Sequence, residues 1–159
     1  MDIRIETLEP VTVAYVRRRG PYQRSASAAW CTLWRWVDEH ELGAGVGQAI
    51  GLGCHNPEVT PPEHLVYDAC LEIRGGFAAD DVVGRQTLPG GRYALLQVKG
   101  AYSGIGPGFD RLREWRRTQD ESTDWRPWIE IYRNSLKDTA EAELLTDLGM
   151  PLAGRVEAV

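Results

Sequence analysis

The sequence predicts an α+β fold of two β-α-β-β units, which are related by pseudo-twofold symmetry and whose antiparallel sheets form a central ligand groove. Three observations support this prediction: strand-like apolar segments end in turn residues, amphipathic helical segments follow them, and both patterns occur twice in the same order. Matching landmarks lie 78 to 80 residues apart, from the pair Gly20 and Gly100 (80) to the pair Asp68 and Asp147 (79). Because five such landmarks keep their order and nearly keep their spacing, we interpret them as an internal repeat.

Each half begins with an apolar strand that ends at a Gly-x-Tyr turn, over residues 13–22 and 93–102. A helix is expected next, because apolar residues recur there with helical spacing and therefore share one face. In the first half these residues are Trp30, Leu33, Trp34 and Val37, and in the second half they are Ile105, Phe109, Leu112 and Trp115. We expect Trp30 and Trp34 to belong to the core rather than to a ligand site.

Two further strands complete each half. Residues 50–56 and 128–134 are apolar segments that end in a turn at Asn, and residues 66–71 and 145–150 form the last strands. We therefore predict one domain over residues 1–159, with the first repeat at about 3–73, a connection at 74–91 and the second repeat at about 92–152. A half of this size is marginally stable alone, so the halves should pack together, and such junctions tend to form concave ligand sites.

Composition and charge exclude several classes of protein. The net charge is −5, which argues against direct binding to nucleic acid, since phosphate contacts need a basic face. Three separated cysteines indicate reduced thiols, and the histidines lack metal-ligand spacing, so neither a metal nor a cofactor is expected. The start is unlike a signal peptide and no apolar run approaches ~18 residues, so we expect a cytoplasmic protein without membrane spans.

An ordered set of short motifs resembles the GyrI-like domain family, the effector-binding domain of AraC-type regulators. The motifs span residues 18–22, 56–63 and 67–70 in the first half, and residues 89–94, 129–134 and 144–148 in the second. The resemblance covers roughly residues 3–152. It implies two β-α-β-β units, and a groove that binds hydrophobic, often cationic small molecules.

The resemblance also bears on the site. The glutamate of the Glu-Ile-Tyr motif is the usual pocket carboxylate of the family, and it corresponds to Glu130 here. This chain departs from the family pattern at Gly53 and Cys54, where an aromatic residue is common, and at Trp128, where smaller residues are usual. We expect the first departure to open one pocket wall and the second to close the other.

Strand geometry gives an independent prediction for the same segment. Side chains alternate between the two faces of a strand, so Trp128, Glu130 and Tyr132 share one face and the two intervening isoleucines share the other. Without the resemblance, the residues favour an exposed glutamate or one paired with a nearby arginine, since strand carboxylates usually face water. In a pocket, its carboxylate would attract a cation while the indole of Trp128 adds a cation–π contact.

Two further tyrosines are candidate ligand-binding residues whose faces alternation leaves open. Tyr67 begins the last strand of the first half, where it either lines the groove or packs beneath the helix, and Tyr93 has the same ambiguity. Trp125, just before the strand that carries Glu130, is a candidate for the pocket rim.

These observations favour a protein that binds a hydrophobic, cationic or aromatic small molecule around Glu130, for sensing or sequestration. The first alternative is a hydrolase of cyclopropane-bearing or other electrophilic genotoxins, with Glu130 as general base and a tyrosine as proton donor. The second is a gyrase-inhibitor-like interaction with another protein. A regulator is also a candidate protein partner, because no helix-turn-helix segment precedes the domain.

Overall fold

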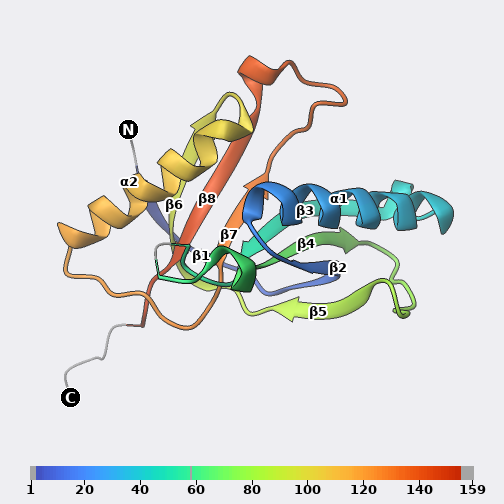
Figure 1. Ribbon diagram of the computed structural model, residues 1–159, viewed down its shortest axis with the longest axis horizontal. Coiled ribbons are helices and arrows are strands. Elements are labelled where there is room, and N and C mark those ends of the chain that lie inside the picture. The colour runs from blue at the N-terminus through green and yellow to red at the C-terminus, as the bar shows by residue number, and fades with distance from the viewer. Residues whose placement is uncertain (1–2, 58, 155–159) are drawn as a thin grey trace.

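The computed structural model describes residues 3–57 and 59–154 and consists of one antiparallel sheet with two helices (Figure 1), which confirms the α+β class. Both ends of the expected domain, and Glu58 of the 56–63 motif, lie outside the described residues. The strands are β1 (Ile3–Leu8), β2 (Val11–Arg19), β3 (Val46–Gly53), β4 (Val66–Ile73), β5 (Gly84–Leu88), β6 (Gly91–Lys99), β7 (Trp128–Tyr132) and β8 (Leu145–Pro151). The α-helices are α1 (Tyr22–Glu39) and α2 (Ile105–Arg117). Within the described ranges, neither is long and apolar enough to cross a membrane.

The predicted element order occurs twice, as β2-α1-β3-β4 and as β6-α2-β7-β8. The sheet has the order β1-β6-β8-β7-β3-β4-β2-β5, so the two half-sheets join through β3 and β7 into one sheet of 8 strands. These central strands are antiparallel, and Gly51 lies directly opposite Glu130. The turn signals also match: Gly20 and Gly100 have φ of 125° and 113°, and their N–H groups donate to the carbonyls of Leu65 and Leu144, each at 2.8 Å.

The edge strands exchange partners between the two halves. β1 precedes β2 in the chain but pairs with β6, whereas β5 precedes β6 but pairs with β2. Residues 74–91, expected to be only a connection, therefore contain an edge strand of the sheet. The alternation in β5 is short and mostly polar, which explains why the sequence pattern did not indicate it.

This exchange forces the sheet to curl. β1 and β2 are first and seventh in the sheet, yet only Glu9 and Pro10 separate them in the chain. Such a turn spans at most about 11 Å, whereas six strand spacings in a flat sheet would span about 29 Å. The two edges must therefore approach each other, and the face inside the curl encloses its own core. That core contains Val13, Ile50, Leu52, Cys70, Leu88, Tyr93, Leu95, Ile129 and Ile131.

Both helices pack on the outer face of the curled sheet. α1 covers β2 and β4, while α2 covers β6 and β8, and the central strands β3 and β7 lie between these two pairs of strands in the sheet. Each helix buries its apolar stripe, with Leu33 and Val37 of α1 and Leu112 of α2 fully inaccessible to solvent. The separation of the two helices leaves the middle of the sheet available as the floor of a groove.

Candidate functional site

A groove of about 1390 Å³ lies between the two helices, above the central strands. It exceeds the usual size of a drug-binding pocket, about 300–1,000 Å³. Its walls are formed by side chains from both helices and from the loops after β3 and β7. The main lining residues are Tyr22, Trp30, Trp34, His55, Tyr67, Tyr102, Ile105, Phe109, Asp110, Arg113, Trp128, Glu130, Tyr132 and Asp138.

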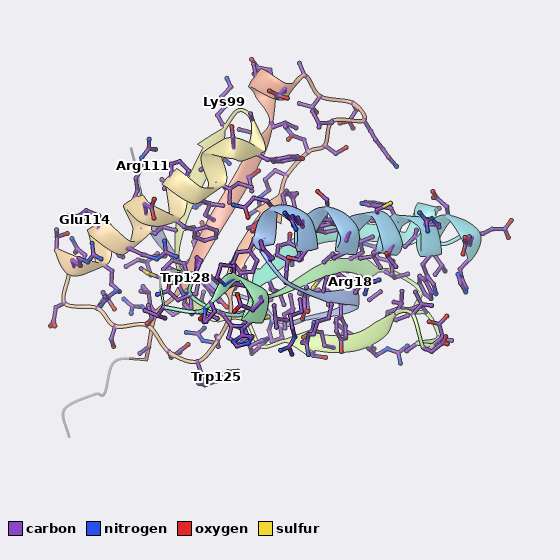
Figure 2. The ribbon with its side chains drawn as sticks, viewed as in Figure 1. Arg18, Lys99, Arg111, Glu114, Trp125 and Trp128 are labelled. Carbon is purple, nitrogen blue, oxygen red and sulfur yellow. The ribbon has the colours of Figure 1, made fainter. Side chains whose placement is uncertain are left out.

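Strand β7 supplies the floor of the groove in the pattern that the alternation predicts. Trp128, Glu130 and Tyr132 line the groove, whereas Ile129 and Ile131 are buried in the core on the opposite face. Figure 2 shows Trp128 near the middle of the molecule, close to α2. The structure therefore brings three of the predicted site residues together along one strand.

A chain of hydrogen bonds ends on the Glu130 carboxylate. The Trp30 indole Nε1 lies 2.9 Å from the Tyr67 hydroxyl, which lies 3.1 Å from the Tyr132 hydroxyl, which in turn donates to Glu130 Oε2 at 2.5 Å. A hydroxyl has one proton to donate. Because Tyr132 donates to Glu130, Tyr67 must donate to Tyr132, and Tyr67 accepts from Trp30. All the donors in this chain consequently point toward the carboxylate.

The electrostatic environment of Glu130 is unusual for a glutamate in a sheet. Burial raises the pKa of Glu130 above its ordinary value, and the hydrogen bond from Tyr132 lowers it in part. No described lysine, arginine or histidine forms an ion pair with it. Burial and the nearby carboxylate also hold the pKa values of Tyr67 and Tyr132 well above the usual range, so both phenols stay protonated. The groove thus contains a carboxylate without a counter-charge among the residues that the structure describes.

Aromatic rings surround this carboxylate. Tyr132 has edge-on contacts with Trp30 and Tyr102, with ring centroids 5.5 and 5.6 Å apart. Near α2, the centroids of the Trp128 and Phe109 rings lie 5.5 Å apart. Such rings offer large apolar faces and negative π-surfaces, which suit flat, hydrophobic and cationic molecules.

Strand β3 gives the tyrosines the space they need. A Cβ atom at Gly51 would overlap the Tyr67 hydroxyl and lie 3.2 Å from the Tyr132 hydroxyl. At Gly53, where the family often has an aromatic residue, a Cβ would meet the Tyr22 hydroxyl at 3.4 Å. The Tyr22 side chain, donating to the His55 carbonyl at 2.6 Å, therefore occupies the wall that we expected to be open.

The structure corrects three expectations about aromatic residues. Tyr93 lies in the core on the opposite face of the sheet, where its hydroxyl donates to the Pro127 carbonyl at 3.0 Å, so it is not in the groove. Trp125 is 82% exposed and points away from the groove (Figure 2). Trp30 and Trp34 line the groove while also packing on the core, since a helix beside a groove presents one flank to each.

Sequence reasoning missed Tyr22 and Arg113. Tyr22 belongs to the Gly-x-Tyr turn, which was interpreted only as a strand end. Arg113 stands 79 residues after Trp34, so the repeat offset could have placed it on the groove-facing side of its helix. Its guanidinium carbon lies 4.9 Å from the centre of the Trp128 ring, the face that was expected to stack on a ligand cation. Within the described ranges, no three His, Cys, Asp or Glu residues cluster as a metal site.

Comparison of the sequence with known proteins identifies relatives of two kinds. A DNA gyrase inhibitor from Pantoea sp. (strain At-9b) is 32% identical over 122 residues, which cover 73% of this chain and 76% of that protein. A probable transcriptional regulator, YgiV from Escherichia coli (strain K12), is 26% identical over 159 residues, covering 96% of this chain and 97% of that protein.

Solved structures share the fold at lower identity. The EcmrR C-terminal domain has a TM-score of 0.77 at 14% identity, over 96% of this chain and 97% of that one. SAV2435 bound to tetraphenylphosphonium has a TM-score of 0.66 at 15% identity, over 97% and 95% of the two chains. A hydrolase encoded by lin2189 from Listeria innocua has a TM-score of 0.63 at 11% identity, over 95% and 91%.

The family model of the GyrI-like small molecule binding domain matches residues 1–153, nearly the whole chain. Its match agrees with the motifs, the fold and the aromatic groove. The chain belongs to the family of GyrI-like small molecule binding domains.

Proposed function

We propose that the chain binds hydrophobic, positively charged aromatic molecules in its groove, with Glu130 as the counter-charge, for sensing or sequestration. The observation that carries this proposal is the environment of the Glu130 carboxylate. It accepts a hydrogen bond from Tyr132 at 2.5 Å and has no ion-pair partner among the described basic residues. Aromatic side chains form the surrounding walls.

The free energy of this arrangement favours a cation. Burying a carboxylate without a partner is costly, and the raised pKa of Glu130 reflects that cost. A bound cation would supply the missing charge, and each aromatic face in contact with it would add about 0.5–2 kcal/mol. The other acidic residues along the groove, Asp110 and Asp138, also favour positive charge. SAV2435, which shares the fold, binds such a cation, and this supports the proposal by analogy.

Isothermal titration calorimetry with tetraphenylphosphonium tests the proposal. The Glu130→Gln variant keeps an acceptor for Tyr132 but removes the charge, so we expect it to weaken binding by roughly 10- to 100-fold. Glu114→Gln is a matched control, because Glu114 lies on the exposed surface of α2, with 72% of its side chain accessible. Equal affinity in wild type and Glu130→Gln would remove Glu130 from the binding site.

The same pair of residues supports a second candidate, a hydrolase. A carboxylate with a raised pKa beside a protonated phenol provides a general base and a proton donor within 2.5 Å of each other. Mass spectrometry after incubation with a cyclopropane- or ester-bearing aromatic compound separates the two functions. A water-added product that requires Glu130 would support the hydrolase, and intact compound recovered from a tight complex would support binding.

A protein partner is a separate proposal. It rests on the relative named as a DNA gyrase inhibitor, and not on the groove. A supercoiling assay with purified gyrase tests it directly, with Glu130→Gln as the control, because a protein interface outside the groove would not respond to that substitution.

A further inference from the structure

Arg113 on α2 is the only arginine or lysine among the described residues that line the groove. Its guanidinium stacks on the Trp128 ring, 4.9 Å from the centre, and only 14% of its side chain is exposed. It therefore places a fixed positive charge inside a groove that otherwise suits cations.

The described residues supply hydrogen-bond acceptors for only some of the N–H groups of the Arg113 guanidinium. Nη1 donates to Asp110 at 3.0 Å, but the Asp110 side chain is 70% exposed, and an ion pair so open to water stabilises little. Nε of Arg113 is buried and has no hydrogen-bond acceptor among the described residues. A buried donor without an acceptor is destabilising unless a ligand or water completes it.

Arg17 in the same molecule shows that the Nε–Nη2 edge of a guanidinium can bind a carboxylate. Its Nε and Nη2 donate to the two carboxylate oxygens of Asp68 at 2.8 and 2.9 Å. The same Nε–Nη2 edge of Arg113 has no carboxylate among the described residues. This planar pair of donors fits a carboxylate in the two-pronged geometry that arginine favours, once a small shift of the guanidinium uncovers Nε, which is closed to solvent here.

Arg113 and Glu130 act on the same part of the groove without pairing with each other. Trp128, beneath Arg113, and Glu130 are two residues apart on one face of β7, a separation of about 7 Å along the strand. The pKa of Tyr22 is raised to about 12, mainly by burial; the charge of Glu130 contributes to the rise and that of Arg113 opposes it. Both charges thus act on the Tyr22 hydroxyl from within the groove that all three residues line.

We propose that Arg113 is an anion-recognition residue and that the groove selects zwitterionic aromatic ligands, with a cationic group at Glu130 and a carboxylate at the free edge of Arg113. This inference rests on the proposed binding function and specifies its ligand class. A molecule with both charges would satisfy Glu130 and Arg113 together, whereas a simple cation would satisfy Glu130 alone and leave the Arg113 donor unpaired.

Rhodamine B and its ethyl ester are a matched pair of probes, because they share one cationic aromatic system and differ only in whether the carboxylate is free. Fluorescence polarisation gives the dissociation constant of each dye for the full chain. We expect Arg113→Gln to weaken the free acid by about tenfold or more while the ester binds as well as before or better. Arg113→Lys, which keeps the charge but loses the planar donors, should fall between. Arg117→Gln, on the exposed surface of the same helix, should change neither.

The ratio of the two dissociation constants distinguishes the possible failures. If Arg113→Gln leaves that ratio unchanged, or weakens both dyes equally in a protein that melts like wild type, the role of Arg113 is wrong and the binding function stands. If Glu130→Gln weakens neither dye, or wild type binds neither, the proposed function fails and the ligand class fails with it. A selective loss of the free acid in Arg113→Gln, together with weaker binding of both dyes by Glu130→Gln, would confirm both.

Discussion

The two central strands of the sheet contrast sharply in what they present to the groove. β3 presents Ala49 and two glycines, and β7 presents Tyr132, Glu130 and Trp128 directly opposite them. The two strands hold equivalent places in the repeated element order, yet one provides space and the other provides functional groups. A symmetric scaffold can therefore form an asymmetric site when side-chain size differs at matching positions.

The helices beside the groove show the same contrast. Trp34 on α1 and Arg113 on α2 are 79 residues apart, and both line the groove. The α1 wall presents the Trp34 ring. The cation over this ring is Lys137, 4.8 Å from its centre, and it comes from the loop after β7 rather than from α1. The α2 wall, in contrast, supplies the cation itself, because Arg113 of α2 lies over the Trp128 ring. Asp68 and Asp147, in contrast, are alike in the two halves, which makes them a reference for the scaffold.

Substitutions of Asp68 and Asp147 should have the largest effects on stability, and the two effects should be similar. Asp68 is buried and held by Arg17 and Gln86, and Asp147 is buried and held by arginines and a glutamine in the same manner. We expect Asp68→Asn and Asp147→Asn each to lower the free energy of unfolding by about 1.5–3 kcal/mol, because each weakens charge-assisted hydrogen bonds of a buried carboxylate to a guanidinium that stays partly open to water. Urea denaturation measures this. A large loss at one site alone would break the symmetry of the scaffold.

The two glycines of β3 that lie opposite β7, Gly51 and Gly53, should respond differently to substitution by alanine. Gly51→Ala would force a Cβ against the Tyr67 hydroxyl, so we expect about 1–3 kcal/mol of destabilisation and a clear loss of tetraphenylphosphonium affinity. Gly53→Ala makes an ordinary 3.4 Å contact with Tyr22 and should change little. Denaturation and calorimetry of both variants give the comparison. Equal effects would mean that the space at Gly51 has no special role.

Acidification should weaken cation binding, because burial raises the pKa of Glu130. A cation favours the charged carboxylate, so affinity should be constant above the pKa of Glu130 and fall about tenfold per pH unit below it. The free fold should respond in the opposite sense, since protonation relieves the cost of a buried charge. Calorimetry across pH with Glu130→Gln as reference measures the effect, and a decline that persists in this variant would assign it to another group.

The smallest effects are expected for two tyrosines on opposite faces of the sheet, and only one of them should change ligand affinity. Tyr67→Phe and Tyr93→Phe each remove one hydrogen-bonded hydroxyl, so each should cost about 1 kcal/mol of stability. Only Tyr67→Phe should weaken tetraphenylphosphonium binding, by a few-fold, because Tyr67 orients the Tyr132 hydroxyl toward Glu130. Equal affinity in the two variants would show that the hydrogen-bond chain does not prepare the site.

Much of the fold could be predicted because local patterns determine it. Helical spacing identified both helices, and the Gly-x-Tyr turns marked the ends of β2 and β6. Alternation placed Trp128, Glu130 and Tyr132 on one face of β7, and the groove lies on that face. β5 was not predicted, because it is a short polar edge strand whose partner lies in the other half of the sequence.

Local sequence patterns are sufficient to assign which residues share a face, since alternation and helical spacing are properties of neighbouring residues. Which face each helix covers depends on long-range packing, and this packing places Tyr67 at the groove and Tyr93 in the opposite core. Both tyrosines sit in strands buried on both sides, where hydrophobic alternation is lost. The position of Arg113 over Trp128 likewise depends on packing between α2 and β7, elements whose contact no local pattern encodes.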